Sequence, residues 1–174
     1  MNMKSKTLEV PKINRSARIG MVATPKQDRG MARSDGAYVT SSGSFSSYII
    51  SDLKPCGEVV FIIGNRKIHV ERALFDTGSN VTEVLSSVLR ENDVPVGDDY
   101  AEQRDYDGIY AVERHSACLE INGGIQICNV EVRSCDLEWL RENGIEAIIG
   151  MDVIALGEFR ICKKHNLPVL EFEV

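Results

Sequence analysis

In Ala73-Leu74-Phe75-Asp76-Thr77-Gly78-Ser79-Asn80, an apolar run ends in a carboxylate and a Thr-Gly turn. Residues 68–75 have the pattern of a strand that enters a hydrophobic core, so Asp76 would leave that strand at the edge of the core. An Asp-x-Gly tripeptide by itself is a common surface turn. The strand before it makes the carboxylate of Asp76 a candidate general acid and base.

A second apolar segment, Ala147-Ile148-Ile149-Gly150-Met151-Asp152, follows later in the chain. With both segments present in this order, the chain resembles the retropepsin-like aspartic proteases, the class with a single Asp-Thr-Gly. The resemblance extends from about residue 57 to residue 174. It implies a mainly β fold, a closed β-barrel with short helices that is active as a homodimer. It also implies that Ile148, Ile149 and Gly150 pack beneath the catalytic carboxylate.

The resemblance gives each residue of the turn a role. Asp76 is the expected catalytic residue, and Thr77, Gly78 and Ser79 are expected to support the turn. Two such carboxylates share a proton, because like charges this close cannot both ionise cheaply. One carboxylate activates a water molecule and the protonated one stabilises the developing oxyanion. Gly78 permits the tight turn, and Ser79 can donate a hydrogen bond to the carboxylate.

The chain holds one Asp-Thr-Gly turn in 174 residues, a length that suggests one domain plus an extension. We therefore expect the second catalytic carboxylate to come from another copy, in an obligate homodimer with the site on its two-fold axis. Asp152 is expected to support the fold rather than to act as an internal partner of Asp76. Met151 stands where related enzymes often have arginine, so any ion pair of that arginine is absent or rebuilt.

The remaining patterns predict hairpins and short helices. Paired strands are predicted over residues 57–63 with 66–75, 116–122 with 125–133, and 159–162 with 169–174. Helical turns are predicted over residues 81–89 and 136–143. In related enzymes the terminal strands of two subunits interleave, and Val169, Phe172 and Val174 would otherwise leave an exposed apolar edge.

An Asp-Gly turn between residues 100 and 115 predicts the tip of a further hairpin. Its position matches the flap of the family, which closes over the substrate and excludes water, although an ordinary surface hairpin remains the alternative. The expected substrate-binding residues are Tyr106, Asp107, Gly108, Ile109 and Tyr110. The substrate would be a peptide or protein bound as an extended strand.

The charge is unevenly distributed along the chain. Residues 1–33 hold eight Lys or Arg and two acidic residues, about +6, so the remainder carries about −12 of the net −6. Residues 34–47 are rich in Ser and Gly, which predicts a flexible connection. We therefore divide the chain into an N-terminal extension, residues 1–54, and a protease domain, residues 55–174.

Several interpretations of the extension stay open. It is an unstructured arm, a prosegment removed by self-cleavage within residues 20–55, or an arm that docks on the acidic body or on the partner subunit. Nucleic-acid binding is not favoured, because the arm lacks interleaved aromatic residues and the body is acidic. The acidic body favours basic residues in the outer parts of a substrate.

Composition restricts the remaining possibilities. The apolar stretches are too short to span a membrane, and residues 1–24 lack the apolar region of a secretory signal. The five cysteines are odd in number and form no Cys-x-x-Cys pair, which favours reduced thiols and a cytoplasmic location. The three histidines lack metal-ligand spacing, so we expect no metal and no cofactor.

The sequence thus predicts an aspartic endopeptidase that hydrolyses peptide bonds as a homodimer, with its own extension as one candidate substrate. One alternative is a catalytically weak or inactive module of the same fold that dimerises or binds peptides. A second alternative is a regulatory protein in which the basic arm acts and the domain is only a scaffold.

Overall fold

The computed structural model describes residues 36–48, 54–97, 99–104 and 108–174. The strands are β1 (Tyr38–Ser41), β2 (Ser44–Tyr48), β3 (Cys56–Ile63), β4 (Arg66–Phe75), β5 (Thr82–Leu85), β6 (Tyr100–Arg104), β7 (Ile109–Ile121), β8 (Ile125–Cys135), β9 (Ala147–Ile149), β10 (Glu158–Lys164) and β11 (Leu167–Glu173). The short helices are α1 (Ser86–Glu91), α2 (Glu138–Glu142) and α3 (Met151–Ile154).

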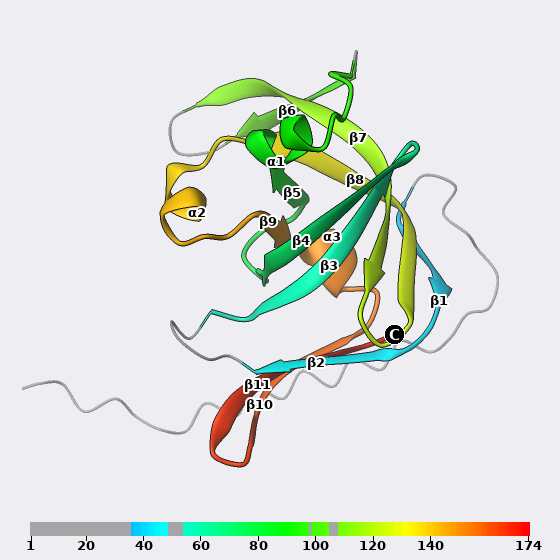
Figure 1. Cartoon of the computed structure of the whole chain (residues 1–174), viewed down its shortest axis with the longest axis vertical. Coiled ribbons are helices and arrows are strands. Elements are labelled where there is room, and N and C mark those ends of the chain that lie inside the picture. Colours follow the sequence, from blue (N-terminus) through cyan, green and yellow to red (C-terminus); the bar gives the residue numbers. More distant parts are fainter. Residues whose placement is uncertain (1–35, 49–53, 98, 105–107) are drawn as a thin grey trace, which may run out of the picture. The chain divides into compact units, whose positions relative to one another are not determined.

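Six strands close into a barrel in the order β8, β5, β9, β4, β3 and β7, because β7 also pairs with β8. Most neighbours are antiparallel, but β4 pairs with β9 and β5 with β8 in parallel. Figure 1 shows β3 and β4 side by side, with β7 and β8 along the next part of the barrel. The predicted mainly β, closed-barrel fold is confirmed.

The barrel closes around a hydrophobic core. Its fully buried large side chains include Phe61, Ile68, Phe75, Leu119, Ile127 and Ile149. On β3, buried side chains alternate with more exposed ones, the pattern of a strand with one face on the core. The core therefore fixes which face of each strand points inward, and with it the place where β4 ends.

The predicted hairpins are present, and on β8 the alternation of buried and exposed residues changes partway along the strand. On β8 the residues Ile125 and Ile127 are buried, but so are Val130 and Val132. Asn129 between them has φ 58°, and the pairing with β7 shifts register opposite it. Simple alternation along residues 125–133 would put Val130 and Val132 on the exposed face, and this bulge turns them to the core instead.

The prediction of a helix over residues 81–89 is wrong for the first half of that segment. Residues Thr82–Leu85 form β5, in which all four side chains are buried. This strand pairs with β8 on one side and β9 on the other. A fully buried central strand has no polar face, so its short apolar run cannot be distinguished from a buried helix by periodicity. The helix begins only at Ser86.

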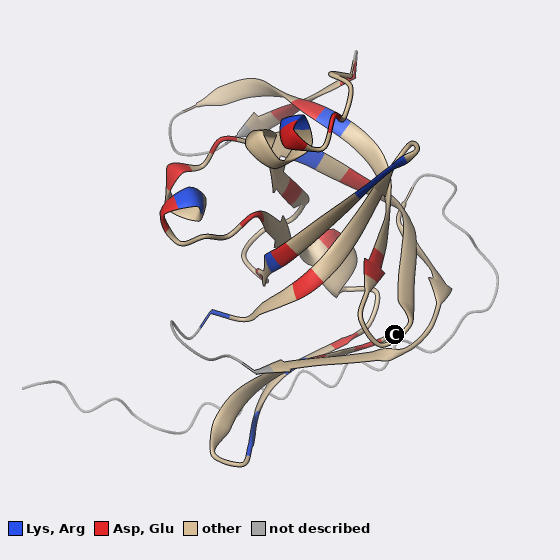
Figure 2. Cartoon of the chain, in the orientation of Figure 1, with Lys and Arg blue, Asp and Glu red and all other residues tan. Residues whose placement is uncertain are grey.

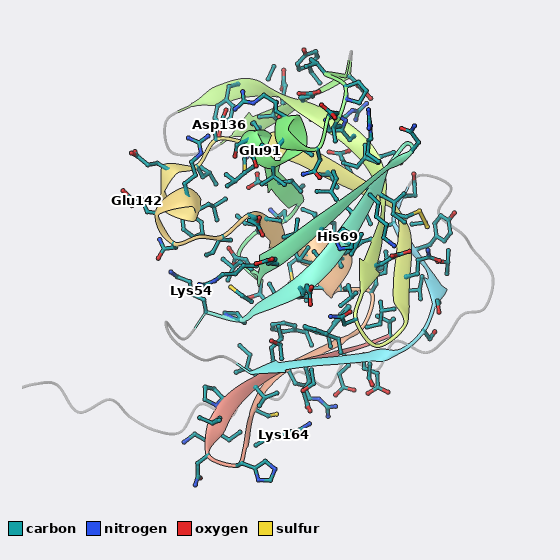
Figure 3. The ribbon with its side chains drawn as sticks, viewed as in Figure 1. Lys54, His69, Glu91, Asp136, Glu142 and Lys164 are labelled. Atoms are coloured by element: carbon teal, nitrogen blue, oxygen red, sulfur yellow. A yellow bond between two sulfur atoms is a disulfide. The ribbon has the colours of Figure 1, made fainter. Side chains whose placement is uncertain are left out.

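The second predicted helix, α2, is present. Leu137 occupies the N-cap position without a side-chain hydrogen bond, and Asp136 pairs with Arg141. Gly144, with φ 60°, follows the helix. Figure 3 labels Asp136 and Glu142, which bracket this helix, and Lys54, which donates a hydrogen bond to Asn143 at its end.

A second sheet of three strands, in the order β10, β11 and β2, lies below the barrel in Figure 1. The Ser- and Gly-rich segment contributes β2 to this sheet and β1 to the barrel sheet, where β1 pairs with β8. The expectation of a flexible connection is therefore wrong for residues 38–48. Composition misses these strands because Phe45, the residue that anchors β2, is a single buried side chain among serines.

The C-terminal strand β11 is paired on both sides within the chain, by β10 and by β2. Val169 and Phe172 are buried, and Val174 is half-buried. The expectation that these side chains would form an exposed apolar edge is wrong, because β2 covers that edge. Interleaving of β11 with a partner strand therefore has no support from unpaired apolar residues.

Two further observations concern the cysteines and the helices. Cys118 and Cys128 form a disulfide between β7 and β8, so the expectation of reduced thiols is wrong for this pair. Cys135 and Cys162 take no part in a disulfide. None of the helices in the part of the chain that the structure describes has the length and apolar character needed to cross a membrane.

Candidate active site

Asp76 follows β4 directly, at the point where the strand leaves the core. Phe75 before it is fully buried, whereas Asp76 is half-buried. The backbone N–H of Asp76 donates to the carbonyl of Ile149 at 3.0 Å, which joins the start of the turn to the end of β9. The N–H of Gly78 donates to the Asp76 Oδ1 atom at 2.8 Å. The Gly78 N–H thus orients the carboxylate, at the end of a strand that is paired on both sides, with β3 and β9.

The three residues that follow Asp76 differ in exposure and in hydrogen bonding. Thr77 and Gly78 are exposed and Ser79 is half-buried. A side chain at Gly78 would put its Cβ 3.1 Å from the Asp76 Oδ1 atom, so glycine leaves room for the carboxylate. The Ser79 hydroxyl donates to the Val81 carbonyl at 2.8 Å rather than to Asp76. Ser79 therefore stabilises the backbone that follows the turn.

The segment Ile148, Ile149 and Gly150 lies directly beside the turn. β9 pairs in parallel with β4, with Ile149 opposite Phe75. A Cβ on Gly150 would lie 2.4 Å from the Val81 carbonyl oxygen, so the two backbones touch at this point. The N–H of Met151 donates to the Ser79 carbonyl at 2.8 Å. Only glycine at position 150 allows this approach.

Asp152 has structural partners. Its carboxylate accepts from the Thr82 hydroxyl at 2.9 Å and from the Thr82 N–H at 3.1 Å. The Thr82 oxygen in turn accepts from the Gly150 N–H at 3.3 Å. Burial raises the pKa of Asp152, and the bonds from Thr82 oppose that rise. This network joins β5 to α3, which fits the expected supporting role of Asp152.

The predicted flap hairpin is formed by β6 and β7, and Arg104 pairs with Ile109 nearest its tip. Gly108, Ile109 and Tyr110 are exposed, and Ile109 is 57% exposed. Tyr106 and Asp107 lie outside the described residues. The hairpin is confirmed, and its action on a substrate stays a prediction.

Glu83 is a candidate site residue that sequence reasoning missed. It lies on β5, is 4% exposed, and accepts a hydrogen bond from the Gln103 Nε2 atom at 2.5 Å. Burial raises the pKa of Glu83, and the nearby charge of Asp76 raises it further. The signal was hidden because a glutamate in an assumed helix is expected on the solvent face. Within the described residues, no group of three His, Cys, Asp or Glu side chains could hold a metal ion.

No family model and no curated protein matches the chain. Among solved structures, the chain is similar to a retropepsin-like aspartic protease from Rickettsia conorii, with 13% identity and a TM-score of 0.52 over 79% of this chain and 97% of that one. It is also similar to the retroviral protease-like domain of Ddi1 from Leishmania major, with 16% identity and a TM-score of 0.38 over 67% of this chain and 93% of that one. The first likeness shows that the chain has a retropepsin-like fold.

Proposed function

We propose that this protein is an aspartic endopeptidase that acts as a homodimer. The observation that carries the proposal is the placement of Asp76. Its carboxylate stands at the end of a buried strand, on an exposed Thr-Gly turn, and accepts the Gly78 N–H at 2.8 Å. A carboxylate held this way can keep one orientation while it exchanges a proton with water.

The second carboxylate comes from the Asp76 of a second copy. Within one chain, the carboxylates of Asp152 and Glu83 already have partners, since Asp152 accepts from Thr82 and Glu83 accepts from Gln103. The exposed face of the turn, at Thr77 and Gly78, leaves room for an identical turn on a two-fold axis. The two carboxylates then titrate as a coupled pair.

The proposed reaction is hydrolysis of a peptide bond. The ionised Asp76 takes a proton from a water molecule, which attacks the carbonyl carbon of the substrate. The protonated Asp76 of the other copy donates to the developing oxyanion, and a proton then passes to the leaving amine. The substrate lies as an extended strand, and the hairpin of β6 and β7 covers it. The chain's own residues 20–55 are a candidate substrate.

Comparison of the wild-type chain with Asp76→Asn tests the proposal. Both proteins are incubated from pH 4 to 7.5 with a mixed peptide library, and intact mass reports self-cleavage. We expect cleavage by the wild type that rises with protein concentration, and at least about a 100-fold loss in Asp76→Asn. Equal cleavage by both proteins would refute the role of Asp76. Absence of cleavage by both, with peptide binding retained, would favour the catalytically inactive binding module.

A further inference from the structure

Glu83 is a buried carboxylic acid that the proposed hydrolysis does not use. Among the described residues, it and Thr82 are the buried polar side chains. Thr82 is accounted for by its bonds to Asp152. Burial of a carboxylate is unfavourable unless a partner compensates it. A purely structural position on β5 would be filled at lower cost by valine or isoleucine.

The groups around Glu83 compensate it only in part. The amide of Gln103 donates one hydrogen bond to the Glu83 Oε1 atom. Arg133, opposite Glu83 on β8, attracts it electrostatically. The Arg133 guanidinium, however, donates to the Glu131 Oε1 atom at 2.8 Å and to the Glu102 carbonyl at 3.3 Å. Much of its hydrogen-bonding capacity is thus used elsewhere.

Gln103 contributes a second acceptor at the same place. Its Oε1 atom is buried, and within the described residues it accepts no hydrogen bond. Such unsatisfied buried oxygens are rare, since each one loses its hydrogen bonds to water. The carboxylate of Glu83 and the amide oxygen of Gln103 therefore form an acceptor-rich pair. A cationic group with several N–H donors satisfies both.

This pair lies between the active-site turn and the hairpin. β9 pairs with both β4 and β5, so Ile148 stands opposite Leu74 on one side and Glu83 on the other. The negative charge of Asp76 contributes to the rise in the pKa of Glu83, after the larger effect of burial. Gln103 belongs to β6, the strand of the hairpin that would cover a bound peptide. A substrate side chain reaches Glu83 only after Gln103 moves, because Glu83 is 4% exposed.

We propose that Glu83 and Gln103 form a specificity subsite that accepts a lysine or arginine side chain of the peptide substrate. The inference rests on the proposed function, because it concerns the substrate of the Asp76 site. In this structure the Gln103 amide is hydrogen-bonded to Glu83. Displacement of β6, an end strand that pairs only with β7 in its sheet, opens the way. The cation then donates to the Glu83 carboxylate and to the Gln103 oxygen.

The test uses pairs of peptides that differ only by lysine or norleucine, with that residue scanned across four positions on each side of the cleaved bond. Norleucine keeps the aliphatic chain and lacks the ammonium group. For wild type we expect kcat/KM to favour lysine by about 10-fold or more at one position. In Glu83→Gln that ratio should fall close to one, while kcat/KM for the norleucine peptide stays within about 3-fold of wild type.

Glu102→Gln is the matched control, because Glu102 is an exposed glutamate on β6 next to Gln103. It should retain the lysine preference of the wild type. Gln103→Leu should lose part of the preference, since it removes one of the two acceptors. An unchanged lysine ratio in Glu83→Gln would overturn the subsite. An equal loss on both peptides in folded Glu83→Gln would also overturn it, because that result assigns Glu83 to catalysis or folding.

A binding measurement separates this inference from the proposed function. The same peptides are titrated against Asp76→Asn and against Asp76→Asn with Glu83→Gln. If the wild type cleaves nothing but Asp76→Asn binds lysine peptides more tightly, and Glu83→Gln abolishes that difference, the subsite stands and the peptidase proposal fails. If the wild type cleaves peptides but shows no preference for lysine, the peptidase proposal stands and the subsite fails. Absence of a lysine preference in both assays overturns the subsite.

Discussion

Gly150 lies where one added methyl group would collide with the backbone that follows the active-site turn. The Cβ of alanine would be 2.4 Å from the Val81 oxygen and 2.5 Å from the Val81 carbonyl carbon. We predict that Gly150→Ala lowers the free energy of unfolding by about 1–3 kcal/mol, because neither backbone can retreat without breaking β5 or β9 contacts. Urea denaturation measures this loss.

Gly36→Ala is the control for that substitution. A Cβ on Gly36 meets nothing within 4 Å, so its stability should stay within about 0.5 kcal/mol of the wild type. Equal stability of the two variants would show that the contact between Gly150 and Val81 is not a tight one.

The buried Glu83 and the half-buried Asp152 make stability depend on pH in a defined direction. Burial raises the folded-state pKa of both above their ordinary values of 4.5 and 3.8. Their contribution is therefore fully present below about pH 4 and is lost as the pH rises through the folded pKa values. We predict that Glu83→Gln gains stability relative to wild type as the pH rises above 4.5, and that the two proteins converge in acid. Denaturation from pH 4 to 7 measures the difference, and Glu102→Gln should parallel the wild type.

At the scale of elements, β2 links the Ser-rich segment to the active site through aromatic packing. The ring of Phe45 stacks on Phe75 at a centroid distance of 5.9 Å, and Phe75 directly precedes Asp76. Phe159 and Phe172 also contact Phe75, at 6.2 and 6.1 Å. We predict that Phe45→Ala lowers the free energy of unfolding by about 3–5 kcal/mol. Thermal or urea denaturation checks this value.

Ser46→Ala is the comparison for Phe45→Ala, because Ser46 is exposed on the same strand. It should leave stability almost unchanged. If Phe45→Ala were equally neutral, β2 would contribute nothing to the domain, and the flexible-connection interpretation of this segment would be restored.

The elements also show which features sequence patterns can reveal. The hairpin of β3 and β4 was predictable because apolar strands flank the Gly64-Asn65 turn, and so was the turn that carries Asp76. These features involve residues that are neighbours in the sequence, so sequence patterns predict them. The flap hairpin was predictable for the same reason, from its Asp-Gly turn.

Other features depend on distant pairing, which one sequence does not record. β5 is a strand only because β8 and β9 flank it. Glu83 was therefore missed as a site residue, since only this pairing buries it and brings Gln103 within reach. The disulfide of Cys118 and Cys128 likewise depends on the register of β7 and β8. The bulge at Asn129 sets that register, and alternation alone predicts the wrong face.

At the scale of the whole molecule, the proposed peptidase activity depends on two copies that share one active site. Figure 2 shows acidic residues on strands of the barrel and on α2, in keeping with the acidic balance of residues 34–174. The sequence holds one Asp-Thr-Gly turn, and Thr77 and Gly78 in it are exposed. Both facts fit an active site that a second copy completes and that receives a basic substrate.

Mixing of wild type with Asp76→Asn tests whether two Asp76 carboxylates, one from each copy, form one active site. The two proteins are combined in equal amounts, left until subunits have exchanged, and assayed at constant total concentration, with the dimer followed by sedimentation. If each site needs two Asp76 carboxylates, random pairing leaves about a quarter of the wild-type activity. A value of about one half would mean that each chain cleaves with its own carboxylate, and would contradict the shared site.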